Sequence, residues 1–186
     1  MGLFLQKTNI IRDYHEDLTE SRIFWPTCVW SKYANQLKDF NSAPYHPKSL
    51  ACLNELVNDV LKHATDSICY LSMLSNKEIF RFCAIPQVMA MATLAKVYNN
   101  PKVFTKSIKI RKGLSAKMFW EVENMNDVCS YFEYFAKEIL IEVEPKNTCG
   151  LETIRTLHKI IEKSQEYRDG RKIELKLRTR LYRLVS

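Results

Sequence analysis

Glycine and proline are scarce in this chain, with 4 glycines and 6 prolines among 186 residues. A sandwich or barrel of many strands needs turns at short intervals, and these two residues supply most of them. Their scarcity argues against such folds. A content of 46% hydrophobic and 26% charged residues is ordinary for a globular chain that buries one core. The composition therefore predicts an all-α fold.

Closely spaced cysteines are also lacking. The six cysteines never stand closer than 14 residues apart, so the sequence holds no CxxC pair of the kind that binds zinc or performs redox chemistry. Free thiols in a reducing compartment fit this spacing best.

Long apolar runs are missing as well. The nearest candidate, Phe82 to Tyr98, is interrupted by Pro86, Gln87 and Lys96, whereas a membrane-spanning helix needs about 20 apolar residues. We therefore expect no transmembrane segment. A secretory signal is not expected either, because the chain turns polar after its first five residues.

The positive charge is concentrated at one end. The net charge is +7, and the segment from Arg168 to Ser186 holds seven basic residues against two acidic ones. The rest lacks the alternating basic and aromatic residues that read RNA, so we do not expect a nucleic-acid partner. The sequence thus predicts a helical domain over residues 1–167 and a basic tail over 168–186, which can touch anionic lipid or phosphate.

Hydrophobic spacing places the helices. Apolar residues recur in steps of three and four from Lys48 to Leu74, which predicts one long amphipathic helix. The segment Asn76–Tyr98 is apolar on most sides and is predicted to be a buried helix. Ile110–Gly113 is predicted to form a loop or a short helical turn, and Asn41–Pro47 a loop. Further helices are predicted over Met1–Asp17, Trp30–Phe40, Asn126–Val143 and Leu151–Tyr167.

One polar stripe runs along the first of these helices. At 3.6 residues per turn its members fall within an arc of about 80°. Apolar residues border the stripe on both sides, which is unusual for a solvent-facing surface and favours a helix whose polar stripe faces a cavity inside a bundle. The stripe consists of Gly2, Gln6, Asn9, Asp13 and Asp17.

The two aspartates of the stripe can share a hard cation. Asp13 and Asp17 lie one turn apart, about 6 Å along the helix axis, while Gln6 and Asn9 place neutral oxygens and donors nearby. Mg²⁺ typically takes one or two carboxylates and completes its shell with waters and substrate phosphates. The spacing therefore points to a magnesium-bound diphosphate.

Four stretches of the sequence resemble squalene synthases in the same order. Residues 2–17, GLFLQKTNIIRDYHED, resemble the second aspartate-rich motif of that family. The likeness fades beyond about Trp120. The other three stretches are Phe24-Trp25-Pro26 with Val29-Trp30-Ser31, then Phe82–Ala90, then Val97–Asn100 leading to Lys109–Gly113.

The resemblance implies an all-α isoprenoid (terpenoid) synthase bundle. Squalene synthases join two farnesyl diphosphates head to head through presqualene diphosphate, and reduce this intermediate to squalene with NADPH. Mg²⁺ neutralises the departing diphosphate, and an aromatic cavity keeps water from the carbocations. Family habit also implies the cytosolic face of the endoplasmic reticulum membrane, with the basic tail as a peripheral contact.

By resemblance, the polar stripe becomes the substrate site. Asp13 and Asp17 would hold Mg²⁺ and diphosphate, and Gln6 and Asn9 would complete the polar face. Arg22 would also face phosphate.

Two further groups follow from the resemblance. Phe82 and Phe80 would line the cation pocket, where a ring face stabilises positive charge. Lys109 and Arg111 would lie near the diphosphate or the NADPH phosphates. His15 points away from the stripe and is expected to pack or titrate on an outer face.

Each assignment has a plainer interpretation. The acidic residues can be a solvated face whose carboxylates pair with Arg12 and Arg22. The two phenylalanines can be core residues, and the basic pair can be ordinary surface.

One part of the family pattern is not found in this sequence. The first aspartate-rich motif, a DxxED pattern on a separate upstream helix, is absent, and Met1-Gly2 falls where the family is already within a helix. We therefore expect a bundle truncated at its N-terminus that carries half of the metal site. The alternative is a non-catalytic helical protein that binds prenyl diphosphate or a partner chain.

Overall fold

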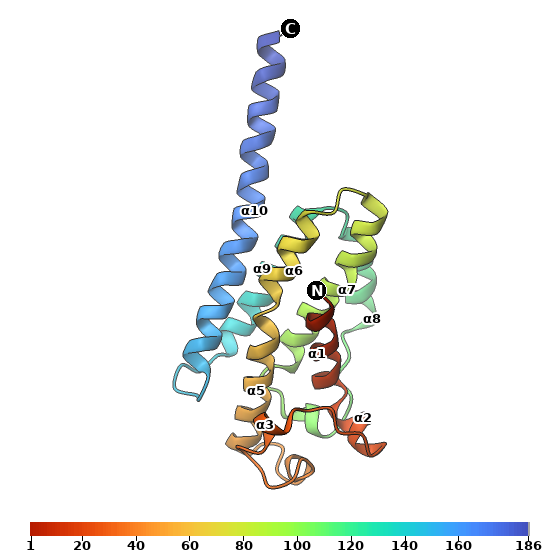
Figure 1. The fold of residues 1–186 in the computed structure, drawn as a ribbon, viewed down its shortest axis with the longest axis vertical. Coiled ribbons are helices and arrows are strands. Elements are labelled where there is room, and N and C mark those ends of the chain that lie inside the picture. The colour runs from red at the N-terminus through yellow and green to blue at the C-terminus, as the bar shows by residue number, and fades with distance from the viewer. Residues whose placement is uncertain (186) are drawn as a thin grey trace.

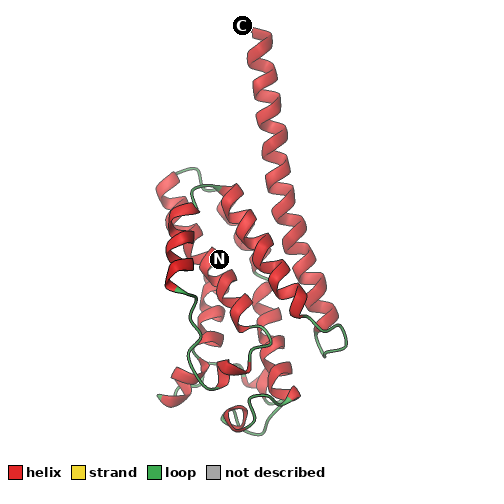
Figure 2. Ribbon diagram, turned by 180° about the vertical axis from the view of Figure 1, so that it is seen from behind, coloured by secondary structure: helices red, strands yellow, loops and turns green. Residues whose placement is uncertain are grey.

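The computed structural model describes residues 1–185, with side chains described through Gly170, and every regular element in this range is helical (Figure 2). This confirms the predicted all-α class. The elements are α1 (Gly2–Arg12), α2 (Tyr14–Thr19), α3 (Thr27–Trp30), α4 (Asp39–Ser42), α5 (Pro47–Leu61), α6 (Ala64–Ser72), α7 (Lys77–Val97), the 3₁₀ turn η1 (Pro101–Phe104), α8 (Lys112–Glu121), α9 (Met125–Glu142) and α10 (Gly150–Val185).

The longer helices form a bundle around one core (Figure 1). Helix α1 packs against both α5 and α7, and α9 packs against both α7 and α10. The rings of Phe4 on α1 and Phe132 on α9 lie 6.2 Å apart in this core, and both side chains are fully buried. One face of the N-terminal helix is thus anchored in the core. Helix α10 continues without a break across residues 167 and 168.

The predicted helix Met1–Asp17 is divided at Asp13. That residue has φ −92° and ψ 10°, so α1 ends and α2 starts in a new direction. The change of direction carries Tyr14 into an aromatic cluster, where its ring lies 4.6 Å from Trp25 and 5.4 Å from Phe104. The Tyr14 hydroxyl is 2.7 Å from the carbonyl oxygen of Leu37, to which it donates. These contacts fix the end of the helix that carries both aspartates.

Two other predicted helices are also interrupted. The helix expected over Lys48–Leu74 divides into α5 and α6. At the break the His63 amide donates to the carbonyl of Val60, three residues earlier, at 3.0 Å, whereas an α-helical amide donates to the carbonyl four residues earlier. The prediction of one helix over Trp30–Phe40 is wrong. Only the short α3 and α4 form there, and the Asp39 carboxylate accepts from the Gln36 amide at 2.8 Å at the start of α4.

The region Ile110–Gly113, expected as a loop or short turn, straddles the start of α8. Arg111 has extended backbone, with φ −64° and ψ 138°, and Lys112 begins the helix. The site residue Arg111 therefore lies immediately before a helix, not within one.

Helix α7 is long and apolar enough to cross a membrane by length and composition. Half of its most apolar window is buried inside the bundle, and the core helix of a soluble protein passes the same test. The helix contains Pro86 in its interior, one of the residues that interrupt the apolar run in the sequence.

Candidate active site

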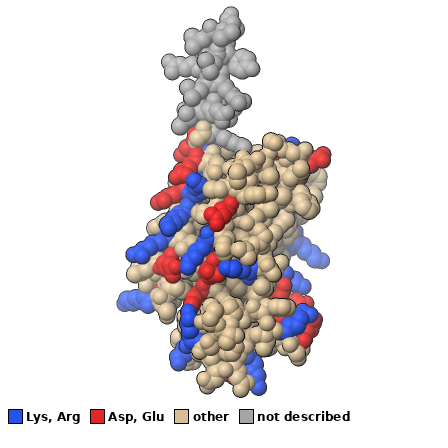
Figure 3. Space-filling view, viewed as in Figure 1, with Lys and Arg blue, Asp and Glu red and all other residues tan. Residues whose placement is uncertain are grey.

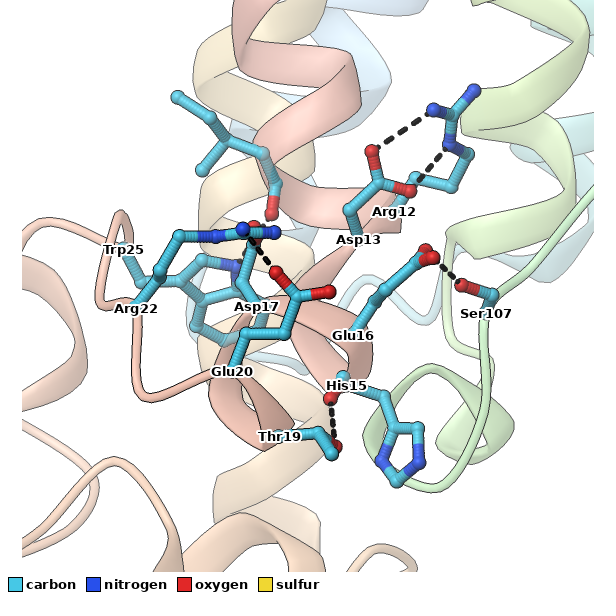
Figure 4. A network of polar contacts seen from close by, with 11 residues as sticks. Arg12, Asp13, His15, Glu16, Asp17, Thr19, Glu20, Arg22, Trp25 and Ser107 are labelled. Atoms are coloured by element: carbon cyan, nitrogen blue, oxygen red, sulfur yellow. Dashed lines mark hydrogen bonds and ion pairs between the residues drawn. The ribbon is translucent and has the colours of Figure 1, made fainter.

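The polar stripe runs along α1, and its acidic end, Asp13 and Asp17, lies where α1 meets α2 (Figure 4). Gln6 and Asn9 are exposed on α1, Asp13 is half-buried at the junction, and Asp17 on α2 is buried. The opposite face of α1 is held in the core by Phe4, Thr8 and Ile11. Packing of the apolar face therefore turns the polar stripe outward along one side of the bundle.

Asp13 is held by its neighbour in the chain. The Arg12 guanidinium donates from Nε to Oδ1 at 2.8 Å and from Nη2 to Oδ2 at 2.9 Å, which is the two-point geometry typical of arginine and carboxylate. The hydrogen bond to Asp13 raises the pKa of Arg12 and outweighs the opposing effect of burial. The Arg12 guanidinium is therefore fully charged at neutral pH.

Asp17 is held by an arginine that follows a tight turn. Arg22 donates to Asp17 Oδ1 from Nε at 3.1 Å and from Nη2 at 2.9 Å, and it also pairs with Glu20. Ser21 has φ 58°, a left-handed conformation unusual for a residue with a side chain, and it turns the chain back so that Arg22 reaches α2. The hydrogen bond to Asp17 raises the pKa of Arg22.

A third contact links α2 to the segment that leads to the basic pair. The Ser107 hydroxyl donates to Glu16 Oε2 at 2.8 Å, as Figure 4 shows. Lys109 and Arg111 follow Ser107 closely and are exposed, and neither forms an ion pair within the described part of the chain. The Glu16 contact thus brings the segment that leads to Lys109 and Arg111 toward the end of the α1–α2 unit (residues 2–19) that carries the aspartates.

The two phenylalanines have different surroundings. Phe80 is 5% exposed and belongs to the core, whereas Phe82 is 81% exposed on α7. A ring that is to contact a substrate must be accessible, so Phe82 fits the expected role and Phe80 fits the plainer one. His15 is half-buried, and its Nδ1 atom is buried without a hydrogen-bond partner among the described residues.

The described side chains do not form a complete protein cage for a metal ion. Among the residues whose side chains are described, no three His, Cys, Asp or Glu residues come close enough to hold a metal ion. Asp13 and Asp17 offer two carboxylates at one end of the α1–α2 unit (Figure 4). Such a pair suits Mg²⁺ that keeps its waters and takes its remaining ligands from a diphosphate.

Some of these contacts were not foreseen from the sequence. The pairing of Arg12 and Arg22 with the aspartates could be expected from the sequence, because each arginine stands within five residues of its carboxylate. The Ser107 contact had none, because the two residues are 91 positions apart. The contact depends on η1 being packed against α2.

Comparisons with known proteins agree with the likeness found in the sequence. The family model for squalene/phytoene synthase matches residues 1–113. A squalene synthase of Yarrowia lipolytica is 47% identical over 147 residues, covering 79% of this chain and 33% of the relative. One of Bos taurus is 48% identical over 153 residues, covering 82% and 37%.

A solved structure points to the same fold. The structure of TcSQS in complex with a ligand superposes with a TM-score of 0.86 at 36% sequence identity. The match covers 89% of this chain and 49% of that one. The chain thus spans about a third of the length of these curated relatives and about half of the solved chain.

Proposed function

The chain belongs to the squalene/phytoene synthase family, and from this premise we propose that it supplies the second aspartate-rich wall of a squalene synthase active site. In this role Asp13 and Asp17 bind a magnesium diphosphate. The parent reaction is the head-to-head condensation of two farnesyl diphosphates through presqualene diphosphate, followed by NADPH-dependent reduction to squalene.

One observation carries the proposal. The two aspartates of the family motif lie at one end of the α1–α2 unit, and each is held by an arginine. A carboxylate beside a guanidinium can bind a ligand that carries both positive and negative charge, because each group takes the part of opposite charge. A magnesium diphosphate is such a ligand, because its cation can take the carboxylates while its phosphates take the arginines.

The side chains divide the chemistry between them. Arg12 and Arg22 can move from carboxylate to phosphate oxygens as the diphosphate arrives, and Gln6 and Asn9 can donate amide N–H groups to it. When bound, Mg²⁺ supplies Lewis-acid neutralisation of the leaving diphosphate. The exposed ring of Phe82 offers a face to the carbocation that remains.

The basic pair is assigned to the phosphates. Lys109 and Arg111 are exposed and without ion-pair partners in the described part of the chain, so both charges are available to the diphosphate or to the phosphates of NADPH. In this proposal residues 1–167 form the helical domain and residues 168–186 the basic tail. The tail contacts the cytosolic face of the endoplasmic reticulum membrane, and its side chains beyond residue 170 lie outside the described part.

Calorimetric titration tests the proposed site. The chain is titrated with farnesyl thiodiphosphate, a slowly ionising substrate analogue, in the presence and absence of Mg²⁺. We expect saturable binding that requires Mg²⁺ and weakens at least about tenfold in Asp13→Asn with Asp17→Asn, because a charge-assisted contact of this kind is worth about 1.5–3 kcal/mol.

A second variant tests whether the loss of a carboxylate outside the site also weakens binding. Asp66→Asn removes an exposed carboxylate on α6 that has no hydrogen bond or ion pair within the described residues, and it should bind like the parent chain. If the parent chain does not bind the analogue, or if Asp66→Asn weakens binding as much as the site variants, the proposal fails.

A turnover assay separates binding from catalysis. The sequence holds one acidic motif where the family uses two, which favours a chain that binds prenyl diphosphate without converting it unaided. With farnesyl diphosphate, Mg²⁺ and NADPH, we expect neither presqualene diphosphate nor squalene from this chain. Detection of either product by mass spectrometry would show that one acidic motif suffices.

A further inference from the structure

A polar cavity lies away from the aspartates, between the α5–α6 junction and the first turns of α10. Its volume is about 290 Å³, and it is lined by Lys62, Thr65, Glu152, Arg155, Thr156 and Lys159. Figure 3 shows Lys and Arg groups gathered on the side of the molecule where α10 lies, with acidic groups between them. We propose that this cavity binds a phosphate group.

The fold brings the three cations together from two places in the chain. Arg155 and Lys159 are four residues apart on α10, so they share one face of that helix. Lys62 caps the C-terminal end of α5, directly after Leu61 and at the break before α6. This break, which divides the amphipathic helix expected from the sequence, therefore aims a cation at the helix that packs alongside.

The positive charge of the cavity is not balanced by the protein. Lys62 pairs with Glu152 at 2.8 Å, whereas Arg155 and Lys159 have no ion-pair or hydrogen-bond partner among the described residues. Three cations thus face one carboxylate. Like charges four residues apart on a helix repel each other, so the arrangement is unfavourable until an anion enters.

The existing ion pair does not close the cavity. The side chains of Lys62 and Glu152 are 47% and 55% exposed, and exposed ion pairs open at little cost. The hydrogen bond to Glu152 raises the pKa of Lys62, so this ammonium stays charged and can turn to a new partner. An anion with more charge than Glu152 can therefore compete for it.

The polar atoms suit a tetrahedral oxyanion. Arg155 presents a planar fork of donors that matches two phosphate oxygens, and Lys159 adds a point charge beside it. The Thr65 hydroxyl has no hydrogen-bond partner among the described residues and can donate to a third oxygen. Thr156 already donates to the Glu152 carbonyl at 2.9 Å, so its hydroxyl keeps only acceptor capacity.

The ligand class is a phosphate monoester. The cavity is open at its mouth and leaves room for the organic group that carries the phosphate. A soluble phosphate ester and a phosphoinositide headgroup share this chemistry. The site contains none of the residues of the α1–α2 unit, so it is independent of the proposed diphosphate site.

Titration with inorganic phosphate, without Mg²⁺ and at constant ionic strength, tests the cavity. We expect saturable binding that weakens at least about tenfold in Arg155→Gln with Lys159→Gln, since each replaces a charge-assisted contact. Lys96→Gln with Lys146→Gln removes the same charge from exposed positions outside the cavity and should leave the affinity within about twofold. Asp13→Asn with Asp17→Asn should also bind phosphate normally.

The proposal is overturned if phosphate does not bind saturably. It is also overturned if Lys96→Gln with Lys146→Gln weakens phosphate binding as much as Arg155→Gln with Lys159→Gln. Vesicles then identify the source of the phosphate. If phosphatidylcholine vesicles bind the chain more tightly when they contain a phosphoinositide, and only Arg155→Gln with Lys159→Gln removes this gain, the ligand is a lipid headgroup. If the gain is equal in all variants while phosphate binding still depends on Arg155 and Lys159, the ligand is a soluble ester.

Discussion

Glu55 on α5 holds the segment between α3 and α4 against the bundle. Its carboxylate accepts from Lys32 Nζ at 2.5 Å and from the Tyr33 hydroxyl at 2.6 Å. Burial alone would raise the pKa of Glu55, but the two hydrogen bonds outweigh burial and lower it. The ionised carboxylate is therefore the form that the folded protein favours.

This lowered pKa predicts an acid-sensitive contact. The stabilisation is complete above the ordinary glutamate pKa of about 4.3 and is lost as the pH falls through the lower folded value. Between pH 7 and pH 3 the parent chain should therefore lose about 1 kcal/mol more unfolding free energy than Glu55→Gln. Urea unfolding at a series of pH values measures this, and parallel curves for the two proteins would contradict it.

The cysteines should differ sharply in reactivity. Cys28 is exposed, whereas Cys52 and Cys129 are buried. Burial, and after it the nearby Glu55, raises the pKa of Cys52 to about 12, so almost no thiolate forms there at neutral pH. Iodoacetamide followed by mass spectrometry should modify Cys28 first, and Cys52 and Cys129 only after unfolding. Early labelling of Cys52 would show that α5 opens locally.

At the scale of elements, the start of α10 depends on a glycine. A Cβ atom on Gly150 would lie 2.2 Å from the backbone oxygen of Glu144 and 3.1 Å from the carbonyl carbon of Pro145. The loop after α9 passes this close only because no side chain is present. Gly150→Ala should therefore lower the unfolding free energy by about 2 kcal/mol.

A second glycine provides the control. A Cβ atom on Gly113 in α8 would meet nothing within 4 Å, so Gly113→Ala should be neutral or stabilise the helix by about 0.5–1 kcal/mol. Thermal or urea unfolding compares the two variants. Equal effects would mean that the loop before α10 moves aside at no cost.

Sequence patterns predicted the long helices but not the places where they break. The segment 76–98, which is apolar on most sides, and the segment 126–143 were predicted to be helices, and α7 and α9 form there. The breaks at Asp13 and His63 arise from single contacts and local hydrogen bonds that periodicity does not encode. The same limit applies to the candidate site, where helical spacing grouped the aspartates but gave no sign of Ser107, 91 residues away from its partner.

At the scale of the whole molecule, one buried carboxylate ties α10 to the bundle. Glu133 on α9 is 8% exposed. It accepts from Lys137 Nζ at 2.6 Å and from Gln165 Nε2 at 3.1 Å, and it also pairs with Arg168. Gln165 and Arg168 both belong to α10, so Glu133 joins two helices at the point where α10 continues toward the basic tail.

Removing this carboxylate should loosen α10 without disturbing the aspartates. Glu133→Ala removes the hydrogen bonds that join the buried carboxylate to Lys137, Gln165 and Arg168 and should cost about 2 kcal/mol of unfolding free energy, with faster hydrogen exchange around residues 160–168. Glu162→Ala, at an exposed position on α10 without a hydrogen bond or ion pair among the described residues, should cost little.

Binding of a prenyl diphosphate analogue should survive Glu133→Ala, because α1 packs against α5 and α7 while α10 reaches the bundle mainly through α9. If Glu133→Ala loses binding of the analogue as well as the α10 contact, the position of α10 affects the aspartates. The effect would then pass through α9 and α7, which lie between α10 and α1. A stability loss no larger than that of Glu162→Ala would instead mean that buried apolar residues such as Leu157 and Ile160 are sufficient to dock the helix.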